Sequence, residues 1–177
     1  MKKQTMKIAM CGMMGALSVT MLLMGFLFPF ATYACPAIAA CTLMIIVYEY
    51  GVKTGLTLYA AISFLGLMLV PDQELVFMFI FVFGLYTVIK MPLDRKLGKK
   101  MRLVAKFAYI NIALMISYSI LLVIFPVAAL VNEFRDYGAG FIVLLFAMFW
   151  LVFFLYDRAV ETVLMIYIRK FRKMFFK

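Results

Sequence analysis

Long apolar runs separated by short polar segments form the dominant pattern along this chain. Each run approaches or exceeds the roughly 20 residues that a helix needs to cross a bilayer. The runs are continuous and lack the period-two alternation of transmembrane β-strands, so they predict helices. The polar breaks divide the chain into six predicted spans, at residues 8–28, 33–48, 54–70, 75–89, 103–131 and 139–167.

The polar breaks are short, with one exception. Residues 90–102 form the longest hydrophilic stretch and separate the first four predicted spans from the last two. The fifth span is long enough either to tilt or to bend at Pro126. Because few residues remain outside the spans, the sequence predicts one transmembrane domain over residues 1–177. The expected fold class is an all-α integral membrane protein, a bundle of six transmembrane helices.

Composition and charge add an orientation to this picture. The chain is 68% hydrophobic, with a mean hydropathy of +1.09. Of its eighteen Lys and Arg residues, all but Arg135 fall on one side of the six-span topology, and basic loops stay in the cytoplasm. Both termini are therefore expected in the cytoplasm, in a multi-pass protein of a bacterial cell membrane. The net charge of +10 beside apolar spans indicates anionic lipid headgroups as partners, and no nucleic acid.

The sequence offers no recognisable catalytic constellation. It contains no His, no phosphate-binding glycine loop and no nucleophile paired with a base. Its three Cys residues lack the spacing of metal ligands. We therefore expect no enzyme, no metal site and no cofactor.

One face of the first predicted span carries small side chains. Ala9, Gly12, Ala16 and Thr20 recur at steps of three and four residues, so they lie on one stripe of a helix. Small residues let membrane helices approach closely, and this drives association where lipid supplies no hydrophobic effect. Ala9, Gly12 and Ala16 are candidate partner-docking residues. Ordinary packing within the same bundle is the alternative.

The predicted outer loops combine polar and aromatic residues. Small-molecule pockets are mostly apolar with a few placed polar groups, and loops of this kind can close over a small ligand. Arg135 would suit a carboxylate or a phosphate. Solvated loop ends, with Arg135 paired to a neighbouring acid, are the alternative. The candidate substrate-binding residues in these loops are Tyr33, Gln73, Glu74, Asn132 and Arg135.

Polar residues inside the predicted spans are further candidates, because a membrane makes them costly to bury. Asn111 and Tyr118 are seven residues apart in the fifth span and therefore face the same way. We include both among the substrate-binding candidates. Near the inner end of the sixth span, Arg158 and Glu161 are three residues apart, which predicts an interfacial ion pair along one helix face.

Two short motifs resemble a known family. Residues 9–17, AMCGMMGAL, look like the Ala-xxx-Ala-type signature on the first helix of substrate-binding S components of energy-coupling-factor (ECF) vitamin transporters. Gly12 stands here in place of one Ala. Residues 49–55, EYGVKTG, look like the acidic-Gly-basic turn that joins the second and third helices in that family. The resemblance covers the whole chain in architecture and these two segments in motif.

The resemblance implies a function. S components bind a vitamin or similar micronutrient from outside, beneath the first, third and fifth loops, and dock their first helix on a membrane scaffold subunit driven by two ABC ATPases. The patterns of riboflavin, thiamin, biotin or folate members are missing, so the ligand stays open. By resemblance, Ala9, Gly12 and Ala16 would contact the scaffold, and Tyr33, Gln73, Glu74, Asn132 and Arg135 would line the pocket.

Other functions fit the same composition. Non-transporting scaffolds of the MreD rod-shape type, which organise cell-wall synthesis, are similarly short and hydrophobic and share much of this fold. A filled bundle without an outer cavity would favour the scaffold, whereas a sealed cavity lined by Asn, Arg and Tyr would favour the S component. A stand-alone facilitator would require a path through the bundle.

Overall fold

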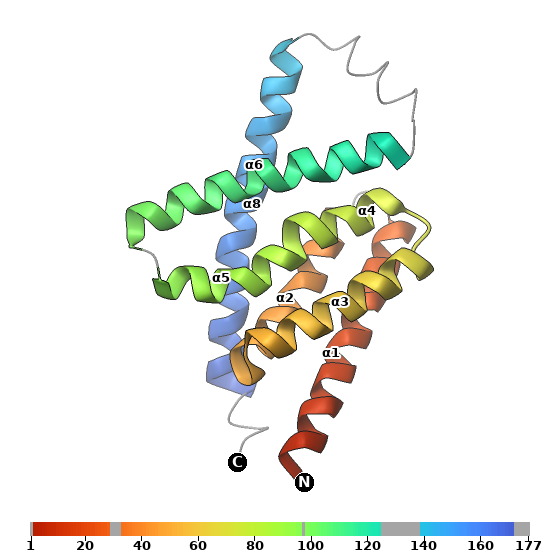
Figure 1. The fold of residues 1–177 in the computed structure, drawn as a ribbon, viewed down its shortest axis with the longest axis vertical. Helices are drawn as coiled ribbons and strands as arrows, with labels where there is room; N and C mark the ends of the chain where they lie inside the picture. Colours follow the sequence, from red (N-terminus) through yellow and green to blue (C-terminus); the bar gives the residue numbers. More distant parts are fainter. Residues whose placement is uncertain (1, 29–32, 97, 125–138, 172–177) are drawn as a thin grey trace.

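The computed structural model describes residues 2–28, 33–96, 98–124 and 139–171, and across these ranges the chain is helical (Figure 1). No strand occurs in the described part, so the predicted all-α fold class is confirmed. Two π-helical segments, labelled η, interrupt or extend the α-helices. The elements are α1 (Lys2–Leu27), α2 (Ala34–Tyr50), α3 (Val52–Leu69), α4 (Gln73–Phe77), η2 (Met78–Gly84), α5 (Leu85–Lys96), α6 (Lys99–Ile124), α8 (Ala139–Ile166) and η3 (Tyr167–Phe171).

Three helical stretches among the described residues are long and apolar enough to cross a membrane. They are Gln4–Leu27, Val52–Leu69 and Gln73–Asp94. The apolar helix Ala34–Tyr50 is shorter. These stretches fall on the first, third, fourth and second predicted spans, in that order. The start of α1 and the end of α8 lie at the same end of the molecule (Figure 1).

The fourth predicted span is longer than its hydropathy indicates. α4, η2 and α5 follow one another without a break from Gln73 to Lys96, past Pro92, and α6 already begins at Lys99. The hydrophilic stretch at residues 90–102 is therefore largely helical. Lys90 and Asp94 each have an ionic partner on another helix, and these partners replace the hydration that the two charges would have in an exposed loop. The predicted end of the fifth span, including Pro126, lies outside the described residues.

α2 occupies the centre of the fold and contacts α1, α3, η2, α5 and α8. It joins α3 through Gly51, whose φ of +85° falls in the region that L side chains rarely adopt. Only a glycine reverses the chain there without strain, and its N–H closes the helix by donating to the Val47 carbonyl at 3.0 Å. The chain therefore turns at Gly51, within segment 49–55, which resembles the turn between the second and third helices of the S components.

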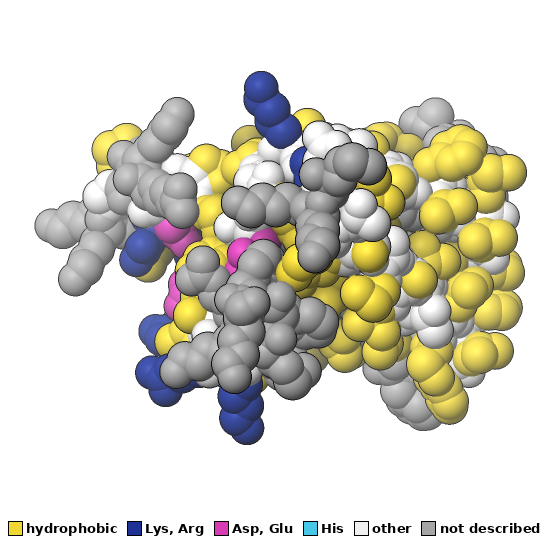
Figure 2. Space-filling view, turned by 90° about the horizontal axis from the view of Figure 1, so that it is seen from below, with side chains coloured by type: hydrophobic (Ala, Val, Ile, Leu, Met, Phe, Trp, Pro, Cys, Tyr) yellow, Lys and Arg dark blue, Asp and Glu magenta, His cyan; other side chains and the backbone are white. Residues whose placement is uncertain are grey.

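Many large apolar side chains are exposed, and a few polar side chains are buried in the mainly apolar core. Ser18, Thr87 and Lys90 are buried, whereas Ile8 and Met115 are 73% and 72% exposed. Figure 2 shows hydrophobic side chains spread over one side of the surface, while the charged ones gather toward the other. Polar groups held inside and large apolar groups turned outward are what a lipid solvent selects.

Candidate functional site

The small-residue face of α1 borders a groove between α1 and α3. Ala9, Gly12, Ala16 and Thr20 are all exposed, and a Cβ added at Gly12 would meet nothing within 4 Å. Ordinary packing inside the bundle, the alternative reading of this stripe, therefore does not account for it within the described residues. The groove has a volume of about 710 Å³ and is lined by Lys7, Ile8, Cys11, Gly12, Gly15, Ala16, Val19, Thr20, Leu58, Ala61, Ile62 and Leu65.

The opposite face of α1 explains why the small stripe points away from the core. Ser18 is fully buried and donates a hydrogen bond to the Ala39 carbonyl of α2 at 3.1 Å. Its hydroxyl also pairs with that of Thr42. Gly25 lies so close to α2 that a Cβ there would be 2.9 Å from the Cβ of Cys35. These contacts fix the rotation of α1 and leave the Gly12 side open.

Two of the predicted substrate-binding residues contact each other. The Tyr33 hydroxyl donates to a carboxylate oxygen of Glu74 at 3.1 Å, joining the start of α2 to the start of α4. The Tyr33 ring also packs edge-on against Phe149 of α8, with centroids 5.7 Å apart. Asp72 caps α4 by accepting from the backbone N–H of Glu74 at 3.1 Å and of Leu75 at 3.4 Å.

The other predicted substrate-binding residues do not join this pair in the described part of the chain. Gln73 donates to the Val70 carbonyl at 3.1 Å. Asn111 donates to the Phe107 carbonyl of its own helix at 2.8 Å, which satisfies its amide locally. Tyr118 lies on α6, but its side chain falls outside the described residues, as do Asn132 and Arg135.

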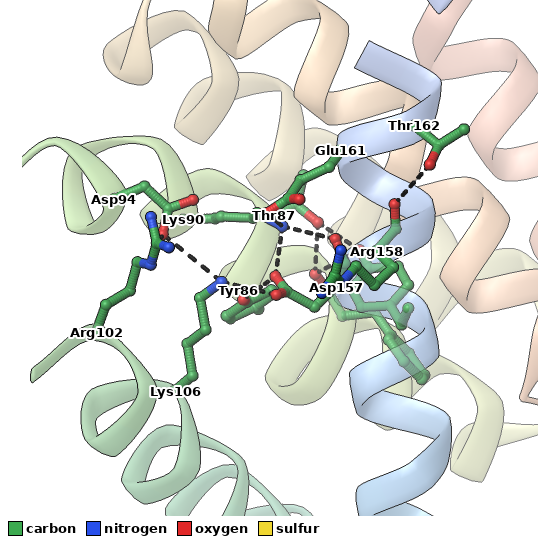
Figure 3. Close-up of polar contacts among 12 residues, drawn as sticks. Tyr86, Thr87, Lys90, Asp94, Arg102, Lys106, Asp157, Arg158, Glu161 and Thr162 are labelled. Carbon is green, nitrogen blue, oxygen red and sulfur yellow. Dashed lines mark hydrogen bonds and ion pairs between the residues drawn. The ribbon is translucent and has the colours of Figure 1, made fainter. Parts of the chain in front are cut away.

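A buried ionic cluster joins α5, α6 and α8 (Figure 3). At its centre, Lys90 of α5 is 1% exposed and pairs with the Asp157 carboxylate of α8. Its ammonium group also donates to the Asp157 carbonyl at 2.7 Å and lies 3.3 Å from the Glu161 carboxylate. The predicted pair of Arg158 with Glu161 is thus replaced, because Lys90 reaches the same carboxylate. Arg158 instead lies over the Phe154 ring, 5.6 Å from its centroid.

α6 completes the cluster from the other side. Lys106 donates to the second carboxylate oxygen of Asp157 at 2.7 Å and lies 3.6 Å from the carboxylate of Asp94. Arg102, one turn earlier, is 3.7 Å from the same Asp94 oxygen. Tyr86 of α5 donates its hydroxyl to Asp157 at 2.5 Å. Asp157 therefore accepts hydrogen bonds from three side chains, which makes it the residue on which the cluster depends.

Further polar contacts gather on the π-helical segment η2. A π-helix widens the backbone and disturbs the regular i→i−4 bonding, so its carbonyl groups need partners that lipid cannot supply. Tyrosines from three other helices provide them. Tyr59 of α3 donates to Ile80 at 2.9 Å, Tyr109 of α6 to Phe81 at 2.5 Å, and Tyr156 of α8 to Phe83 at 3.3 Å.

A cleft of about 500 Å³ opens between α6 and α8 beside the ionic cluster. One part of its lining is charged and the other is aromatic or aliphatic. Trp150, which lines it, is the single tryptophan of the chain. The lining residues are Arg102, Leu103, Lys106, Phe107, Ile110, Trp150, Phe153, Phe154, Asp157, Arg158 and Glu161.

The sequence predicted a cytoplasmic position for the cations of this cluster and paired Glu161 with Arg158, but it left Lys90, Lys106 and Asp157 without predicted partners. A usable signal exists, because Asp157 and Glu161 are one turn apart on an apolar helix and need cations at the same depth. Lys90 and Lys106 stand near the ends of two other apolar stretches, at the same side of the predicted topology, and are the natural partners. The tyrosines that bind η2 give no comparable signal in the sequence.

No protein-family model, curated protein or solved structure matches this chain.

Proposed function

We propose that this protein is a six-span membrane protein with both termini in the cytoplasm of a bacterium, and that it is the substrate-binding S component of an ECF-type transporter. In this role it binds a vitamin-like micronutrient at the outer face of the cell membrane. It delivers the micronutrient through a complex with a membrane scaffold subunit and two ABC ATPases. The chain contains no nucleotide-binding motif of its own, so it depends on such partners for energy.

The observation that carries this proposal is the open groove along the small face of α1. Gly12 and Ala16 line the groove, and the Cβ position of Gly12 is unobstructed. A second helix can therefore approach the backbone of α1 closely, which is how membrane helices associate. This is the surface on which the family resemblance locates contact with the scaffold subunit.

The proposed substrate pocket lies at the other end of α1. Tyr33 and Glu74 support this location, because their hydrogen bond joins the start of α2 to the start of α4. In our proposal Gln73, Asn111, Tyr118, Asn132 and Arg135 complete the lining. The hydroxyl, carboxylate, amide and guanidinium groups of this set would orient a small polar ligand.

A scaffold of the MreD rod-shape type is the second candidate. The groove on α1 would serve a cell-wall synthesis partner equally well. In addition, Tyr33 bonds Glu74, and Gln73 and Asn111 bond backbone carbonyls, so these donors are already occupied in the structure. A ligand would have to displace those contacts, whereas a scaffold needs no free donors there.

Affinity purification of the tagged protein from its native cells in mild detergent, followed by mass spectrometry, distinguishes the two. Recovery of two ABC ATPases with a membrane scaffold subunit supports the transporter. Recovery of cell-wall synthesis proteins supports the second candidate. Recovery of neither set, with the tagged protein itself intact and folded, contradicts both proposals.

A further inference from the structure

The cleft between α6 and α8 carries an unbalanced charge. The cations of the cluster beside it outnumber the carboxylates by four to three, which leaves one positive charge among the described side chains. A net positive charge beside membrane helices attracts an anionic headgroup. The four cations are Lys90, Arg102, Lys106 and Arg158, and the three carboxylates are Asp94, Asp157 and Glu161.

Arg158 is the cation that the cluster does not use. Lys90 and Lys106 are both bonded to Asp157, and Arg102 lies near Asp94. The guanidinium group of Arg158 is instead directed over Phe154, and no described carboxylate pairs with it. A guanidinium offers five donors in a planar fork that matches the oxygens of a phosphate group.

The rest of the cleft is suited to hydrocarbon. Phe107, Trp150 and Phe153 line it beside the charged groups. At its rim Leu103 is 66% exposed and Phe154 is 59% exposed, so apolar surface continues outward from the charged end. A small inorganic anion would leave this surface uncovered, whereas an amphiphile would cover it while placing its charge at the basic end.

We propose that this cleft binds an anionic phospholipid, with the phosphate between Arg158 and Arg102 and an acyl chain against Phe107 and Trp150. A phosphodiester carries the single negative charge that the cluster lacks. Basic pockets between membrane helices are known to select anionic headgroups in this way. The inference does not rest on the transported ligand, because neither Arg102 nor Arg158 is among the residues proposed to bind it.

The fluorescence of Trp150 reports directly on the cleft, because Trp150 lines the cleft and is the only tryptophan in the sequence. The full-length protein is reconstituted in phosphatidylcholine vesicles, and brominated phosphatidylglycerol or brominated phosphatidylcholine is then added as a short-range quencher. We expect brominated phosphatidylglycerol to quench Trp150 at lower mole fraction. We expect Arg158→Gln to reduce this preference about fivefold, the loss of roughly one cation near an anionic lipid.

Arg169→Gln is the matched control, because Arg169 is an exposed arginine of η3 that does not line the cleft. It should retain the preference for phosphatidylglycerol. Equal quenching by the two lipids overturns the proposal, as does a preference that Arg158→Gln and Arg169→Gln reduce alike. A third arm adds inorganic phosphate. Relief of quenching at low phosphate concentration would show a site for free anions and would also overturn the assignment to lipid.

Discussion

Lys90 of α5 and Asp157 of α8 form an ion pair in which the lysine is almost completely enclosed. The same carboxylate also accepts from Lys106 and Tyr86, while Lys90 has Glu161 as its second acid. The pair is therefore asymmetric. Asp157 joins three helices, whereas Lys90 could be lost with Lys106 still in place to neutralise Asp157.

That asymmetry predicts different costs for the two neutralising substitutions. Lys90→Met should reduce the free energy of unfolding by about 3 kcal/mol, the lower end of the range for breaking a buried pair. Asp157→Asn should cost more, because it leaves both Lys90 and Lys106 without their principal acid. Thermal or SDS unfolding followed by circular dichroism in detergent gives the order. Equal losses, or a larger loss for Lys90→Met, would contradict the central position of Asp157.

The tyrosines on η2 can be tested one hydroxyl at a time. Tyr59→Phe and Tyr109→Phe each remove a donor from a carbonyl of the π-helical segment, and we expect a loss of about 1 kcal/mol for each. Tyr50→Phe is the control, because among the described residues its hydroxyl bonds only the sulfur of Met10, a weak acceptor, at 3.5 Å. Unfolding curves of the three variants should separate the control from the other two. No separation would mean that η2 does not need these donors.

Two glycines on α1 should respond oppositely to the same change. Gly25→Ala places a methyl group 2.9 Å from the Cβ of Cys35, so α1 and α2 must separate slightly, at a cost of about 1 to 3 kcal/mol. Gly12→Ala meets nothing and should leave stability unchanged or raise it, because alanine is the better helix former. Comparison of the two unfolding midpoints tests the rotation of α1. A larger loss of stability for Gly12→Ala than for Gly25→Ala would contradict the rotation of α1 seen in the structure.

Larger side chains on the open face of α1 should affect the partner and spare the fold. Gly12→Leu and Ala16→Leu fill the groove, so we expect recovery of a copurifying membrane partner to be abolished. Ala108→Leu adds the same bulk at an exposed position of α6 outside the groove and serves as the control. Thermal unfolding should be similar for all three. Undiminished partner recovery with Gly12→Leu would remove the groove as the docking surface.

The helices themselves could be predicted from local sequence. Apolar runs indicated their approximate positions, and segment 49–55, which resembles a turn, contains the turn that the structure shows at Gly51. These signals are local, since a cap or a turn is decided by a residue and its near neighbours. The small stripe on α1 was also visible, although its openness depends on what α2 covers. Its role in docking stays a prediction.

The polar interior could not be predicted in the same way. Lys90 and Asp94 look like loop residues because a hydropathy scale scores every charged side chain as polar, whether or not it has an ionic partner. That partner is on α8, and nothing near Lys90 in the sequence indicates it. The sequence does not predict the π-helical segment η2 either, because its apolar residues would suit an α-helix equally well. Asn132 and Arg135, which lie outside the described residues, remain predictions.

The pairing of Lys90 has a consequence for how the chain is made. Asp157 lies 67 residues after Lys90 in the chain, so Lys90 is synthesised before the carboxylate that neutralises it. At about 5 to 20 residues per second, this interval lasts roughly 3 to 13 s. During it, Asp94, one turn away, is the nearest acid, and the long lysine side chain can extend toward the headgroups. Lys90 can be enclosed only after α8 has been synthesised, so insertion of α8 is the step that completes the ionic cluster.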